Sequence, residues 1–310
     1  FLIGNLPIGK DFPIRVIAEI ENAPALTESE IIQRAKYYIN CGAHIIDLGM
    51  IVGQPHPEKI EEMVKAVKTK LNVPVSIDTH NEIEIKAGVE AGADLILSID
   101  KSNIQAADFL KDTPVVVLSS GGKKISDGPF DRIQSLEDNI KFVRHFGISK
   151  IVADPVLNPL NFGFIESIVA YYEFMKRNPT IPVLFGVGNV VELFDVDSVG
   201  VNALLAGMAF ELGVSLIFTP EASPKTKGSV KELSMANKML LLAGQRSSYP
   251  KDLGINLLIL KEKVERKEEY IPDEKNVEVV VAQSRENFVR DPKGIFRILL
   301  DKDQIVVLHF

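Results

Sequence analysis

The chain has 310 residues, of which 46% are hydrophobic and 25% charged, and its formal net charge is −7 at pH 7. This composition is that of an ordinary folded globular protein and excludes wholesale disorder. The acidic balance and the lack of a dense Lys/Arg cluster argue against a nucleic-acid-binding surface, and no apolar run approaches the roughly 20 residues that a membrane span needs.

Short, almost continuously apolar runs alternate with helical segments from the start of the chain. Such runs are typical of parallel strands that are buried on both faces. Between them, Thr27–Glu30 has the spacing of a capping box and Ser135–Asp138 an acidic variant of it, so each predicts the start of a helix. Glycines 42, 92, 147 and 213 stand where helix C-caps are needed. The predicted strands are 15–21, 44–50, 73–79, 94–100, 114–120, 150–156, 182–188 and 215–221.

Eight strand–helix units in about 240 residues favour a (β/α)8 TIM barrel over a doubly wound sheet. We predict that the barrel covers residues 1–248. The segment 247–250 is expected to be a linker, and residues 249–310 are expected to form a small C-terminal α/β or β-rich unit. In that unit, Asp301–Asp303 is a predicted hairpin turn.

Polar side chains gather where the predicted strands end, which is where a barrel of this kind builds its active site. They are carboxylates, amides and hydroxyls, and no Lys or Arg stands at the strand tips. Such a set suits a donor-rich, neutral or cationic heterocycle and suits a phosphate poorly. Aspartates in such places also cap helices, and Asn189 alone fits a turn residue, a phosphate cradle or a group placed for chemistry. The set is Glu19, Asn22, Asp47, Asp78, Ser98, Asp100, Ser119, Asp154, Asn189 and Glu221.

Several of these residues lie in segments that resemble a known family. The segments are AEIEN (18–22), CGAHIIDLGM (41–50), VPVSIDTH (73–80), AGADLILSI (91–99), IVADPVLNP (151–159) and GVGNV (186–190). They resemble the pterin-binding enzymes, which include dihydropteroate synthases and the methyltetrahydrofolate methyltransferases that serve corrinoid proteins.

The resemblance implies a set of site residues. Asp78 and Asp154 would hold the pyrimidine side of the pterin, with Asn22 and Asn189 near the reactive ring. Asp78 and Asn189 are the expected catalytic residues, and the glycines beside Asn189 are expected to leave room for a flat ring. The expected pterin-binding residues are Glu19, Asn22, Asp47, Asp78, Ser98, Asp154, Gly186 and Asn189, and no metal site is expected.

The chain resembles the methyltransferase branch more than the synthase branch. Dihydropteroate synthases carry Arg-Pro in the second loop and Ser-Arg-Lys after the seventh strand, where this chain has Gln54-Pro55 and 188–190 (GNV). Methyltransferases carry Glu-Arg-Ile-Asn and Ser-Asn-Val, which residues 19–22 and 188–190 match more closely. Ser98 departs from both branches, which carry Asn after the fourth strand.

The function implied is methyl transfer from N5 of a tetrahydropterin, either tetrahydrofolate or tetrahydromethanopterin, to an acceptor such as a corrinoid or a thiol. Because Cys41 is the only cysteine, the chain has no disulfide and no zinc-thiolate site. We therefore expect a cytoplasmic protein, with a separate corrinoid or methyl-acceptor protein as partner and, by resemblance, a homodimer. The alternatives are a synthase-like condensation of a pterin with an arylamine, a non-catalytic pterin-binding subunit, and a phosphate site after strands seven and eight.

Overall fold

The computed structural model describes residues 1–110, 112–119, 128–259, 293–294, 296–301 and 304–309. The chain divides into two compact units, Phe1–Leu258 and Ile259–Phe310. The expected domain boundary after residue 248 stays a prediction.

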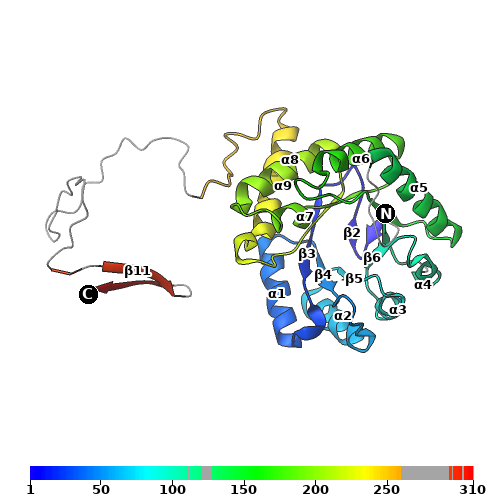
Figure 1. Ribbon diagram of the computed structural model, residues 1–310, viewed down its shortest axis with the longest axis horizontal. Helices are drawn as coiled ribbons and strands as arrows, with labels where there is room; N and C mark the ends of the chain where they lie inside the picture. Colours follow the sequence, from blue (N-terminus) through cyan, green and yellow to red (C-terminus); the bar gives the residue numbers. More distant parts are fainter. Residues whose placement is uncertain (111, 120–127, 260–292, 295, 302–303, 310) are drawn as a thin grey trace. The chain divides into compact units, whose positions relative to one another are not determined.

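The first unit is built on a sheet of eight parallel strands with helices around it (Figure 1). The strand order is β8-β7-β6-β5-β4-β3-β10-β9, and a parallel bridge between Ala153 and Val183 joins the two ends of the sheet. This nearly closed ring confirms the predicted (β/α)8 TIM barrel. The strands are β3 Arg15–Ile20, β4 Ile45–Gly49, β5 Val75–Asp78, β6 Leu95–Ile99, β7 Val115–Leu118, β8 Ile151–Asp154, β9 Leu184–Gly186 and β10 Leu216–Thr219.

One of the two predicted helix starts and two of the predicted glycine C-caps are confirmed. Thr27 and Glu30 form the expected capping box at the start of α1, and Gly42 and Gly213 end α1 and α8 with positive φ. The predicted helix start at Ser135 is wrong, because α5 begins at Pro129, whose ring presets the helical φ. The helices are α1 Glu28–Cys41, α2 Pro57–Leu71, α3 Glu82–Glu90, α4 Ala107–Leu110, α5 Pro129–His145, α6 Phe164–Arg177, α7 Gly188–Val191, α8 Ser198–Leu212 and α9 Ser229–Gln245.

A small N-terminal hairpin, β1 Leu2–Ile3 and β2 Leu6–Pro7, packs against the barrel interior. Ile3 and Ile8 are 0% and 2% exposed and join the apolar cluster that Ile17 and Leu95 form inside the ring of strands. Two-residue strands are too short to leave a period in the sequence, so sequence analysis missed this hairpin. Apolar packing here leaves the opposite end of the ring, where the strands end, for polar side chains.

In the second unit, β11 Phe296–Asp301 pairs antiparallel with β12 Gln304–His309. Asp301 pairs with Gln304, so the connection spans two residues, in agreement with a tight hairpin. Those two residues, and the apolar run 276–283, lie outside the described residues.

His44 lies immediately before β4, with its side chain partly buried. Its Nδ1 accepts a hydrogen bond from the Val16 backbone N–H at 3.1 Å, which requires an unprotonated Nδ1. Burial, together with the positive charges of Arg15 and Lys238, lowers the pKa of His44 to about 4. The folded protein therefore favours neutral His44.

This shift predicts a pH-dependent contribution to stability. Unfolded histidine has a pKa of about 6.5, so the contribution of neutral His44 is complete above that pH and is lost as the pH falls through the folded pKa of about 4. Between pH 7 and pH 4, the free energy of unfolding of the wild type should fall by about 3 kcal/mol relative to His44→Asn. Urea unfolding of both proteins at several pH values measures this difference, and parallel pH profiles would contradict it.

Candidate active site

A pocket of about 340 Å³ opens where β3, β4 and β5 end. Its wall is formed by Glu19, by residues 50–53 and Pro55 of the loop after β4, by residues 78–81 at the end of β5, and by Glu84 of α3. Glu84 is already satisfied, because its two carboxylate oxygens accept hydrogen bonds from His56 N and Thr79 Oγ1. Among the described residues, the carboxylates of Glu19 and Asp78 are the two in the pocket wall without a hydrogen-bond partner.

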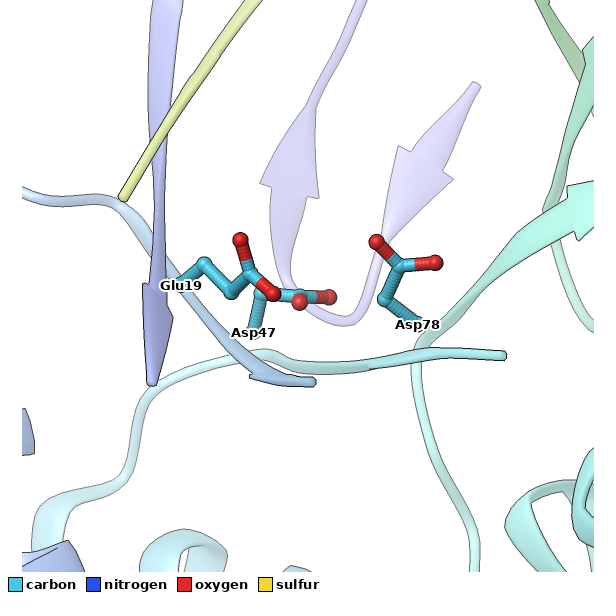
Figure 2. A group of neighbouring side chains, drawn as sticks. All are labelled: Glu19, Asp47 and Asp78. Atoms are coloured by element: carbon cyan, nitrogen blue, oxygen red, sulfur yellow. The ribbon is translucent and has the colours of Figure 1, made fainter. Parts of the chain in front are cut away.

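Glu19, Asp47 and Asp78 bring their carboxylates together at this position (Figure 2). One oxygen from each lies within 4.8 Å of the others. The sheet register explains the meeting, because Glu19 pairs with Asp47 across β3 and β4, and Asp78 pairs with Gly49 across β4 and β5. Gly49 also gives Glu19 its space: a Cβ at this position would lie 2.3 Å from Glu19 Oε1.

Burial and neighbouring carboxylates raise the pKa of all three acids above their usual values. Burial, followed by the charge of Asp78, raises the pKa of Glu19 to about 8. Burial and the charge of Asp154 raise the pKa of Asp78 to about 7. Burial raises the pKa of Asp47 well above its usual range, and the neighbouring carboxylates add to this shift. The site therefore favours protons, a cation, or a ligand that donates hydrogen bonds.

Asp154, at the end of β8, is fixed by two donors. Its Oδ1 accepts hydrogen bonds from the Tyr171 hydroxyl at 2.6 Å and from the Val156 backbone N–H at 2.7 Å. Within the described part of the chain, no hydrogen bond engages Oδ2. Burial raises the pKa of Asp154 to about 6 against the opposing effect of these hydrogen bonds. One oxygen thus anchors the side chain and the other is left as an acceptor.

Arg132 of α5, which sequence analysis missed, holds the loop that follows Asp154. It is 2% exposed, and its Nη1 donates to the carbonyl oxygens of Pro155 (3.1 Å) and Val156. Val156 has φ of 67°, a left-handed conformation that costs a β-branched residue about 1–2 kcal/mol. The guanidinium therefore stabilises the strained turn that places the Val156 N–H against Asp154. No local sequence pattern signals such a long-range contact to backbone carbonyls.

Asn189 lies in the short helix α7 and not in a turn, and its side chain is exposed. Its Nδ2 donates to Leu157 O at 2.9 Å, which leaves Oδ1 and one N–H for other partners. A Cβ at Gly188 would lie 2.5 Å from Pro220 Cδ, and the expectation that both neighbouring glycines make room for a ring stays a prediction. Gly188 is needed for packing against Pro220, whereas a Cβ at Gly186 would make an ordinary contact with Asn189 at 3.6 Å.

Other predicted site residues lie apart from this pocket. Asn22 is exposed and has a left-handed backbone at the start of a short 3-10 helix, Ala23–Ala25. Ser98 is 4% exposed, and its carbonyl accepts from Asn103 Nδ2 at 2.9 Å. Neither is among the residues that line the 340 Å³ pocket. Along the described residues, no helix combines the length and the apolar character that a membrane crossing demands.

The chain is similar to proteins of known family. The sequence model of the family described as pterin binding enzyme matches residues 21–199. An uncharacterized protein of Methanocaldococcus jannaschii is 44% identical over 318 residues, covering 99% of this chain and 60% of that protein. A dihydropteroate synthase of Streptococcus pyogenes is 26% identical over 183 residues, covering 52% of this chain and 66% of that protein. The chain therefore spans less than two thirds of either curated relative.

Solved structures share the barrel. A Yersinia pestis dihydropteroate synthase in complex with a sulfonamide drug superposes with a TM-score of 0.63 at 20% identity, covering 80% of this chain and 98% of that one. A Coxiella burnetii dihydropteroate synthase in complex with pteroic acid gives 0.59 at 22% identity, covering 74% and 92%. These likenesses support the fold alone. Together with the match to residues 21–199 and the close relative, the barrel leads to one conclusion: this chain belongs to the family of pterin-binding enzymes.

Proposed function

We propose that this chain is a transferase that moves a methyl group from N5 of a tetrahydropterin, tetrahydrofolate or tetrahydromethanopterin, to an acceptor such as a corrinoid or a thiol. One observation carries the proposal. Neither the residue that ends each barrel strand nor the residue after it is Lys or Arg. Among the described residues, no hydrogen bond engages the carboxylates of Glu19 and Asp78 or the Oδ2 atom of Asp154. The strand ends are thus built for a neutral or cationic ring that donates hydrogen bonds, and they offer little to a departing anion.

The carboxylates suit the pyrimidine side of a pterin. A 2-amino-4-oxopyrimidine ring presents adjacent N–H donors, and an ionised carboxylate accepts such donors. Asp154 offers Oδ2 for this purpose because Tyr171 and Val156 occupy Oδ1. We assign Asp78, whose charge interacts with that of Asp154, to a further ring N–H.

Asn189 is our candidate for assistance at N5. The amine at N5 leaves readily only when it gains a proton or a strong hydrogen bond as the carbon–nitrogen bond breaks. Asn189 keeps one N–H and Oδ1 available beyond its bond to Leu157 O. Hydrogen-bond assistance of this kind contributes about 10²–10⁴-fold in rate. We propose that the acceptor comes from another molecule or from a part of the protein outside this chain, since Cys41 lies on α1, outside the pocket.

A second function has specific support. Curated relatives of this chain include dihydropteroate synthases, which favours condensation of a pterin with an arylamine. Against it stands the lack of basic residues at the strand ends, because departure of pyrophosphate requires positive charge. A non-catalytic pterin-binding subunit is the third reading. From the resemblance we also propose a homodimer, which sedimentation equilibrium would test.

Calorimetric titration separates these functions. We expect tetrahydrofolate or tetrahydromethanopterin to bind, and methyl release from the methylated form to a Co(I) corrinoid to fall about 100-fold in Asn189→Ala, with pterin affinity nearly unchanged. Asn189→Asp, which keeps an oxygen at the same place, is the matched variant. Turnover that requires a pterin pyrophosphate and an arylamine would support condensation. Binding without turnover would support the subunit, and no binding of any reduced pterin would overturn all three.

A further inference from the structure

Glu19 and Asp78, which line the pocket, form an anionic cluster with the buried Asp47, and one oxygen of each carboxylate lies within 4.8 Å of the others. In the view of Figure 2, the Asp47 carboxylate lies between the other two. Among the described residues, no Lys or Arg forms an ion pair with any of them. Three like charges without a counter-ion are unfavourable, but acidic clusters are common on proteins and do not by themselves define a site.

A buried oxygen of Asp47 is a second observation that points to a bound ligand. Its side chain is 0% exposed, and its Oδ1 accepts a hydrogen bond from Ser76 Oγ at 2.5 Å. Its Oδ2 is buried and has no hydrogen-bond partner. A buried carboxylate oxygen without a partner costs several kcal/mol, so native proteins satisfy nearly all such atoms. This oxygen belongs to the residue that lies centrally in the cluster, where a ligand would meet all three carboxylates.

We propose that Glu19, Asp47 and Asp78 bind one hard divalent cation, such as Ca²⁺, Mn²⁺ or Mg²⁺. The three donors are oxygens, which these ions prefer over nitrogen or sulfur. Two oxygens bound to one Ca²⁺ at about 2.3–2.6 Å can be separated by up to roughly 5 Å, which accommodates the 4.8 Å limit observed. Mg²⁺ binds oxygen at about 2.0–2.1 Å, so two of its oxygen ligands lie at most about 4.2 Å apart, and it would need a tighter cluster than Ca²⁺ does.

A bound cation would still leave room for a second ligand in the pocket. Three protein ligands occupy half of an octahedral shell, so the remaining positions are available to water or to an oxygen of a bound molecule. Each carboxylate has a second oxygen, so Asp78 can bind the ion and still accept a ring N–H. The ion also provides the positive charge that the strand ends lack. A positive charge at this place would favour the synthase-like alternative over methyl transfer, so binding of the ion is tested in the absence of a pterin, where the outcome depends on neither reaction.

Mn²⁺ binding tests it directly. Protein freed of metal by chelation is titrated with Mn²⁺ at pH 8, and the free ion is followed by its electron paramagnetic resonance signal. We expect one Mn²⁺ per chain, displaced by Ca²⁺ and Mg²⁺. Asp47→Asn should weaken binding by at least about 100-fold, since loss of an outer-shell partner alone costs about 10–100-fold. Circular dichroism checks that the variant is folded.

Two further variants make the test specific. Gly49→Ala places a Cβ against Glu19 Oε1 and should weaken binding without replacing a ligand. Glu84→Gln is the matched control, because Glu84 lines the same pocket but already has partners for both oxygens, and it should bind as the wild type does. Absence of stoichiometric binding at 1 mM Mn²⁺, or binding that Asp47→Asn leaves unchanged, would overturn the proposal. Neither result would affect the pterin titration.

Discussion

Asp154→Asn is expected to weaken the binding of a reduced pterin by about 10²–10³-fold while the barrel stays folded. The reason lies in the two donors that hold this side chain. Tyr171 OH and Val156 N–H both require an acceptor, so the new amide must turn its oxygen toward them. Its NH₂ group then occupies the place of Oδ2 and meets the ring N–H groups donor to donor. Losing one or two hydrogen bonds to a charged acceptor, at about 1.5–3 kcal/mol each, costs about 1.5–6 kcal/mol in all, and the stated range corresponds to about 3–4 kcal/mol, near the middle of it.

Calorimetric titration of wild type and variant with tetrahydrofolate or tetrahydromethanopterin measures this loss. Tyr171→Phe is the matched variant, because it removes one of the two donors but keeps the carboxylate, and it should cost about tenfold or less. Asp138→Asn, an exposed change on α5, controls for loss of an acidic group. A pterin affinity of Asp154→Asn within threefold of the wild type would contradict the assigned role.

The sequence allowed the strands and their polar ends to be predicted for a physical reason. A parallel strand covered on both faces reads as a continuous apolar run, and the first polar side chain after it falls at the end of the barrel where strands converge. For this reason Glu19, Asp47 and Asp78 were predicted together, and the register places them together. Their roles in binding and chemistry stay predictions.

The features that sequence analysis missed depend on contacts between distant segments. Tyr171 and Arg132 are helical residues whose partners lie 17 and 23 or more positions away, and the partners of Arg132 include backbone carbonyls. Neither contact leaves a periodic or local pattern. The prediction that a helix starts at Ser135 was wrong for a related reason. The Ser135 hydroxyl donates a hydrogen bond to the Ser119 carbonyl oxygen instead of capping a helix. Gly188 likewise contacts Pro220, which only the folded chain brings near.

Arg132→Met should lower the free energy of unfolding by about 2–4 kcal/mol, the largest stability effect we expect from a single side chain here. Arg132 is almost fully buried, and among the described residues no carboxylate pairs with it. Its burial therefore also has a desolvation cost, which Met removes. Against that gain, Val156 O loses its donor and Pro155 O keeps only the Ser119 hydroxyl. Hydrogen bonds from a charged donor contribute about 1.5–3 kcal/mol each, and orphaned buried carbonyls add to their loss.

Urea unfolding measures the change, with Arg144→Met on the exposed side of the same helix as control, expected within about 0.5 kcal/mol of wild type. A second consequence follows from the same contact. Without the guanidinium, the left-handed Val156 is free to relax, and its N–H no longer fixes Asp154 Oδ1. Arg132→Met should therefore also weaken pterin binding under conditions where it remains folded. If it loses stability but binds pterin as the wild type does, then Arg132 supports the barrel without positioning Asp154.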